Sequence, residues 1–252
     1  MNAMAILESF FRWIHIGAGV VWIGHLYFFN WVNANFAPTM DGPTKQKVVP
    51  ELMPRALYWF RWGAAFTWIT GLLLLLLVFY HGGIMFEGAS WGPAAMALVA
   101  FTFLAPFFYD MLIKGVGTKN VMAAIAIGYL VIVGFVFAMS QVAHFGYRAT
   151  NIHVGAMLGS IMAFNVWFRI WPAQQKIVAA IKGGTAPDAA LVASAGLRSK
   201  QNTYMSLPLL WTMMSAHSTW ASQWWFVLPV VVLLGWWIIK MLFKRASKVK
   251  GF

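Results

Sequence analysis

The chain has 252 residues, of which 61% are hydrophobic and only 10% are charged. A soluble domain carries about 25% charged residues, so this composition excludes a soluble protein and indicates an integral membrane protein. The formal net charge is +12, but the basic residues fall in alternate loops rather than along one surface stripe, so we expect no nucleic-acid partner. The sequence has no Cys, which excludes disulfides, thiolate metal sites and covalently attached c-type haem.

Segments of about 20 mainly apolar residues can cross a bilayer. The first such segment is too long for the apolar region of a secretory signal, so we expect it to remain as a helix. The sixth is short and contains Pro208, which neighbouring helices can accommodate. The seven expected spans are residues 9–32, 57–80, 94–113, 121–143, 151–172, 203–220 and 224–242. They predict one all-α domain over residues 1–252, a bundle of about seven transmembrane helices.

Lys and Arg residues predict the orientation of this bundle. Sixteen of the 18 lie in alternate links, at the span ends that flank these links or at the C-terminal end of the chain, which all fall on one side of the membrane. The positive-inside rule makes that side cytoplasmic. We therefore expect a periplasmic N-terminus, a cytoplasmic C-terminus and a cytoplasmic helical link over residues 173–202, with a break at Gly183-Gly184.

Five of the six histidines lie at or near the outer ends of the expected spans. Histidine is costly inside a bilayer and usually marks a ligand or proton site there. His81 beside Gly82-Gly83 has the character of an interfacial residue. His25 lies deeper, about 15 Å from His15 along a helix that rises 1.5 Å per residue, so these two cannot bind one iron atom.

The remaining outer histidines are candidate iron ligands, because a chain without Cys must hold a redox cofactor non-covalently. Haem b needs two imidazoles on opposite faces of the ring, and helix bundles build such sites in their cores. The candidates are a pool from which no pair is chosen: His15, His144, His153 and His217. Three of them fall within expected spans, whereas His144 follows the fourth span.

Arg12 and Arg148 are the two basic residues on the outer side. Arg12 precedes His15 by three residues and shares its helix face, and Arg148 lies between His144 and His153. A guanidinium forms strong bidentate pairs with carboxylates, so both are candidates to bind haem propionates or an anionic substrate. The alternative is that each reaches lipid phosphates.

Methionines near His217 make a copper site an alternative to the haem site. Met205, Met213 and Met214 precede this histidine, and sulfur with imidazole suits Cu(I). Methionine is also a common core filler.

Three separated blocks of sequence carry a family resemblance. The blocks are Phe11-Arg12-Trp13-Ile14-His15-Ile16 running on to Asn30, Ile152-His153-Val154-Gly155 running on to Asn165 and Pro172, and Arg198-Ser199-Lys200-Gln201-Asn202 followed by Leu207-Pro208 and Met214-Ser215-Ala216-His217. In this order they resemble the membrane domain of bacterial membrane-bound urate hydroxylases.

The resemblance implies an oxidoreductase of the bacterial inner membrane that hydroxylates urate. It also implies that three histidines are functional residues: His15, His153 and His217. Members of that family typically carry a C-terminal cytochrome c domain, whereas this sequence stops after the seventh span, so we expect a separate periplasmic cytochrome c or another redox subunit as partner.

The expected function is a haem b-binding oxidoreductase or electron-transfer subunit. Its haem would lie near the periplasmic face and accept electrons from urate or a quinol. The alternatives are a copper-handling membrane protein and a non-catalytic membrane subunit of a respiratory complex.

Overall fold

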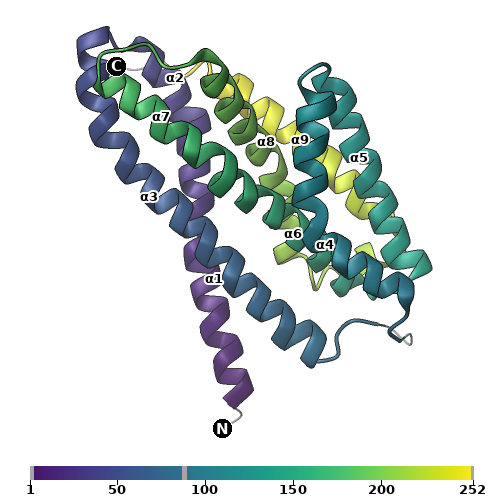
Figure 1. The fold of residues 1–252 in the computed structure, drawn as a ribbon. Helices are drawn as coiled ribbons and strands as arrows, with labels where there is room; N and C mark the ends of the chain where they lie inside the picture. Colours follow the sequence, from purple (N-terminus) through teal and green to yellow (C-terminus); the bar gives the residue numbers. More distant parts are fainter. Residues whose placement is uncertain (1–2, 87–89, 251–252) are drawn as a thin grey trace. The chain divides into compact units, whose positions relative to one another are not determined.

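The computed structural model describes residues 3–86 and 90–250, which form an all-helical chain (Figure 1). The α-helices are α1 (Ala3–Tyr27), α2 (Ala34–Phe36), α3 (Gly42–Leu74), α4 (Pro93–Leu112), α5 (Val121–Phe137), α6 (Tyr147–Asn165), α7 (Trp171–Lys182), α8 (Ala189–Met214) and α9 (Val227–Ala246).

Six continuous helical stretches are long and apolar enough to cross a membrane. They are Ala3–Thr39, Gly42–His81, Pro93–Gly117, Val121–Val142, Tyr147–Lys182 and Val227–Ala246. Six of the seven expected spans lie largely within these stretches, which makes the chain a multi-pass membrane protein. Several stretches are much longer than the expected spans because polar helical turns extend them: α3, for example, begins at Gly42 rather than near residue 57.

The expected span 203–220 is wrong in its bounds. Its residues belong to α8, which begins at Ala189 and ends at Met214. The early start follows from an Ala-rich segment of good helix formers. Beyond Met214 the chain turns, and Ser218 N–H donates to the Ser215 carbonyl at 2.9 Å. His217 therefore lies in a turn and not within a helix. The expected break at Gly183-Gly184 is confirmed, because α7 ends at Lys182.

Large apolar side chains cover much of the outer surface. Trp13, Val20 and Leu130 are 74%, 70% and 66% exposed. A soluble monomer rarely exposes large contiguous apolar patches, so these side chains are suited to lipid.

Five π-helical segments follow directly on α-helices of the described chain. They are Phe28–Asn33, Leu75–His81, Ile113–Gly117, Ala138–Val142 and Val166–Ile170. A π-turn takes more residues than an α-turn and is frequent at functional sites. Each one changes the face on which the residues after it lie.

The chain divides into two compact units. Unit 1 comprises residues 1–8, 71–161 and 207–235, and unit 2 comprises residues 9–70, 162–206 and 236–252. The prediction of one domain stays a prediction.

In unit 2, α7 runs antiparallel to α3 (Figure 1). Gln46 near the start of α3 donates to the Lys182 carbonyl at 3.3 Å, and Trp167 Nε1 donates to the Arg61 carbonyl at 3.1 Å. The contact between α1 and α3 depends on Gly63, where a Cβ atom would lie 3.0 Å from the backbone N of Trp22.

In unit 1, α4 and α5 form a hairpin. Asn120 caps α5 by accepting from the Ala123 N–H at 3.0 Å, and Pro93 occupies the first turn of α4, where its missing N–H costs nothing. The α8–α9 contact is similarly close, since a Cβ atom at Gly235 would lie 2.9 Å from Pro208 Cδ.

Candidate functional site

Three helix connections of unit 1 meet at one end of that unit. The connection after His81 contacts the one before α6, because Gly146 N–H donates to the Met85 carbonyl at 2.9 Å. The turn after α8 joins them, because the Tyr147 hydroxyl donates to the Ser215 carbonyl at 3.3 Å. His81, His144 and His217 lie in or beside these connections and His153 lies on the second turn of α6, whereas their role as cofactor ligands stays a prediction.

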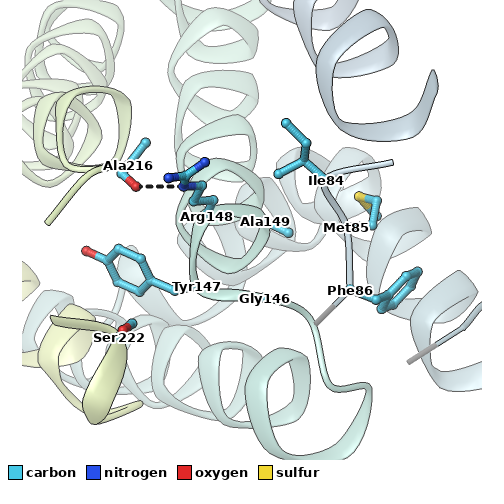
Figure 2. Close-up of a pocket in the computed structure, with 9 residues that line it drawn as sticks. All are labelled: Ile84, Met85, Phe86, Gly146, Tyr147, Arg148, Ala149, Ala216 and Ser222. Atoms are coloured by element: carbon cyan, nitrogen blue, oxygen red, sulfur yellow. Dashed lines mark hydrogen bonds between the residues drawn. The ribbon is translucent and has the colours of Figure 1, made fainter. Parts of the chain in front are cut away.

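A pocket of about 250 Å³ opens where these connections meet (Figure 2). Its lining residues are Ile84, Met85, Phe86, Gly146, Tyr147, Arg148, Ala149, Ala216 and Ser222. Arg148 is exposed and donates through Nε to the Ala216 carbonyl at 3.2 Å. Its two terminal nitrogens make no hydrogen bond to the part of the chain that the structure describes. The pocket thus combines a cation with aromatic, sulfur and hydroxyl groups, which suits a small planar anion.

His153 lies on the second turn of α6 and is 0% exposed. Its Nδ1 is 2.7 Å from the Ala149 carbonyl, which can only accept, so Nδ1 carries the proton. Nε2 is consequently an acceptor in the neutral ring, and it lies 2.9 Å from the Tyr80 hydroxyl. A carbonyl-bound Nδ1–H is the usual arrangement behind a metal-binding Nε2, but here Tyr80 occupies that nitrogen.

The other histidines of unit 1 are exposed. His81 ends a π-helical segment, and His217 follows α8. His144 precedes α6 with φ at 54°, in the left-handed region that a non-glycine residue adopts at a cost. Within residues 3–86 and 90–250, no three His, Asp or Glu side chains form a group that could hold a metal ion.

His15 belongs to unit 2, where α3 fixes its orientation. Its Nδ1 lies 2.9 Å from the Thr67 carbonyl and 3.2 Å from Thr70 Oγ1. Nδ1 therefore carries the proton, and Nε2 keeps its lone pair with no hydrogen bond from the described residues. Arg12 is exposed one turn earlier. His25 also bonds a carbonyl through Nδ1, that of Val21 at 2.7 Å.

Sequence reasoning missed two sets of buried polar side chains. In unit 2, Asn165 Nδ2 donates to Asn202 Oδ1 at 2.8 Å, and Asn202 Nδ2 donates to the Met162 carbonyl at 3.0 Å. Asn165 and Asn202 stand in the resemblance blocks but carried no assigned role. In unit 1, Asn151 and Ser215 are buried, and their polar side-chain atoms have no partner among the described residues. A polar residue on an apolar helix is the signal that could have drawn attention to Asn151.

Comparison with known proteins identifies the family. The family model described as "Urate oxidase N-terminal" matches residues 40–251. The blocks around His153 and His217 lie within the matched residues, and the block around His15 precedes them. No curated protein and no solved structure matches. Since the match covers most of the sequence, the chain belongs to the urate oxidase N-terminal family.

Proposed function

We propose that this chain is the membrane subunit of a urate-oxidising system, that it binds the anionic substrate at the Arg148 pocket, and that it passes electrons through haem b. The subunit lies in the bacterial inner membrane with the pocket end of unit 1 facing the periplasm. A separate periplasmic cytochrome c or another redox subunit receives the electrons.

The Arg148 pocket is the observation that carries this proposal. The guanidinium keeps its terminal N–H groups for a ligand while the Ala216 carbonyl holds Nε. Phe86 and Met85 offer apolar surface for a flat ring on one side of the pocket, and Tyr147 lines the opposite side (Figure 2). A planar heterocyclic anion such as urate satisfies these groups together, because the charge pairs with Arg148 and the ring covers the apolar wall.

Two histidines support the haem assignment because a backbone carbonyl holds the proton of each ring on Nδ1, so that Nε2 has the lone pair that iron needs. The Thr67 carbonyl holds Nδ1–H of His15, which leaves Nε2 able to bind iron. His153 has the same tautomer, although Tyr80 must release its Nε2 first. His144 and His217 remain in the candidate pool as exposed residues. When bound, haem b would take up electrons one at a time and pass them to the partner.

Arg12 remains a second proposed propionate or anion ligand. It lies one turn before His15 on α1 and is exposed. Its role is separable from that of Arg148 because the two arginines belong to different units.

The visible spectrum of the purified, dithionite-reduced chain tests the haem. A b-type α-band that is lost in His15→Ala or His153→Ala supports the proposal. Stoichiometric copper without porphyrin would contradict it and favour the copper alternative.

Titration of urate onto the oxidised chain tests the pocket. Arg148→Gln is expected to raise the Kd for urate by about tenfold or more, because a charge-assisted bond contributes about 1.5–3 kcal/mol. Arg55→Gln is the matched control, since Arg55 is exposed and paired with Glu51 at 2.7 Å in unit 2. Equal affinity in the wild type and Arg148→Gln would remove the pocket from the proposal.

A further inference from the structure

The contact between α6 and α8 in unit 1 is antiparallel, with its register fixed at three points. The Tyr147 hydroxyl donates to the Ser215 carbonyl at 3.3 Å. A Cβ atom at Gly155 would lie 2.8 Å from Met213 Cε and 3.1 Å from Thr212 Cβ, and one at Gly159 would lie 3.7 Å from Leu209 Cδ1. Gly155 therefore lets the two helices approach closely.

Asn151 lies on this contact face. It follows Tyr147 by four residues and precedes Gly155 by four, and residues four apart share a helix face. The register consequently places Asn151 opposite the last turn of α8, between the Ser215 and Thr212 contacts. Ser215 directly follows α8 on this side, whereas Trp211 lies on a different face of α8 from the contacting residues Leu209, Thr212 and Met213.

Polar atoms on these facing surfaces lack partners. Asn151 is 1% exposed, and neither its Nδ2 nor its Oδ1 has a hydrogen-bond partner among the described residues. Ser215 is 4% exposed with an unbonded Oγ, and Trp211 Nε1, on another face of α8, is buried and unbonded as well. A buried polar group left without a partner costs about 1–3 kcal/mol, so native proteins rarely keep several together without a ligand or water to satisfy them.

These atoms adjoin the Arg148 pocket. Tyr147 and Arg148 line that pocket and precede Asn151 by one helical turn, while Ala216 lines it and directly follows Ser215. In Figure 2, Tyr147 extends on the side of Ala216 and Ser222, away from Met85 and Phe86. Tyr147 thus lines the pocket on the side where the segment after α8 lies.

We propose that the Arg148 pocket continues, behind Tyr147, into a specificity subsite in which Asn151 and Ser215 bind an N–H/C=O edge of the ligand. A side-chain amide offers a donor beside an acceptor and is complementary to the lactam or ureide edge of a planar heterocycle. The ligand class is therefore a cyclic ureide anion, whose charge pairs with Arg148. This inference rests on the proposed function for the choice of urate as the ligand.

Paired binding measurements test the subsite. Urate and benzoate are both planar anions, but only urate has N–H/C=O edges. Asn151→Leu is expected to raise the Kd for urate by about tenfold, as loss of one or two net hydrogen bonds requires, and to leave the Kd for benzoate unchanged. Arg148→Gln is expected to weaken both ligands.

Milder variants guard against a folding defect. Ser215→Ala removes a single polar group and should lower the preference for urate over benzoate in the same direction as Asn151→Leu, whereas Trp211→Phe, on another face of α8, should leave this preference unchanged. Asn35→Leu is the matched control, because Asn35 is exposed and bonded to the Trp31 carbonyl at 2.9 Å in unit 2.

The outcomes separate this inference from the proposed function. An unchanged urate-to-benzoate preference in Asn151→Leu, or absence of urate binding to the wild type, overturns the subsite and assigns these atoms to water. Asn151-dependent binding of urate to a chain that never passes electrons from it supports the subsite and contradicts the proposed activity.

Discussion

Buried side-chain amides and hydroxyls of unit 2 bond other protein groups, whereas those of Asn151 and Ser215 in unit 1 do not within the described chain. In unit 2, the amides of Asn165 and Asn202 bond each other, Asn30 Nδ2 donates to Ser199 Oγ at 2.8 Å, and the Tyr27 and Ser206 hydroxyls pair at 2.9 Å. In unit 1, the amide of Asn151 and the hydroxyl of Ser215 have no partner within residues 3–86 and 90–250.

The difference separates polar residues that hold helices together from those available to a ligand. Interhelical hydrogen bonds stabilise membrane helices modestly when both partners come from the protein. Buried polar groups without a hydrogen bond destabilise the fold, so they persist where binding of a ligand compensates for this loss of stability. Buried polarity alone therefore does not mark a binding site. A partnerless atom does so only beside a pocket, since Trp22 Nε1, Trp31 Nε1 and Arg61 Nε of unit 2 are also buried without a partner among the described residues.

The same substitution in both units gives the largest expected effect. Asn165→Leu removes the donor of the bond to Asn202 and is expected to lower the free energy of unfolding by about 2–3 kcal/mol. Asn151→Leu removes unsatisfied atoms and should leave stability unchanged or raise it by about 1 kcal/mol. Unfolding of the detergent-solubilised chain measures both. Equal destabilisation by the two variants would break the comparison.

Tyr80→Phe tests a buried polar pair of unit 1 whose two side chains satisfy each other. It leaves Nε2 of His153 without its hydroxyl partner, so we expect a loss of about 1–2 kcal/mol in the free energy of unfolding. Tyr58→Phe is the control, because Tyr58 is exposed in unit 2. A neutral Tyr80→Phe would mean that His153 behaves like the unsatisfied residues around the pocket.

His144 allows a smaller test, of backbone strain beside the pocket. Its φ of 54° disfavours β-branched residues, so His144→Val is expected to destabilise the chain by about 1 kcal/mol and His144→Gly to be neutral or stabilising. His81→Val serves as control, since His81 is exposed without a positive φ. Thermal unfolding of the three variants measures the effect, and equal melting temperatures would argue against strain.

The smallest effect is expected at the surface of unit 2. Asp41 precedes α3, and hydrogen bonds from the Thr44 side chain and backbone N–H lower the pKa of its carboxyl below the ordinary value of 3.8. A lowered pKa in the folded state stabilises the fold above pH 3.8, and this contribution is lost as the pH falls through the lowered value. Asp41→Ala should therefore flatten the dependence of stability on pH below about pH 4. An unchanged dependence of stability on pH below about pH 4 would contradict this prediction.

Much of the helical layout follows from sequence because apolar runs of bilayer length are unambiguous. The expected span 121–143 differs from the helical stretch Val121–Val142 by one residue. The bounds of α8 were missed because its first half is helical without being apolar. The partnerless state of Asn151 could not be read from sequence either, since it depends on the register that Gly155 and Thr212 set between two helices.

The π-helical segment Leu75–His81 has a consequence for how this chain tolerates change. A π-turn holds one residue more than an α-turn, which rotates the residues after it by about 100° relative to a straight α-helix. Tyr80 lies within this segment and reaches Nε2 of His153 from there. Deleting one residue between 75 and 79 would remove this extra residue, restore α-geometry and leave the Tyr80 hydroxyl facing α6. This stretch should accordingly accept the loss of one residue, whereas at its full length the contact between Tyr80 and His153 requires the π-turn.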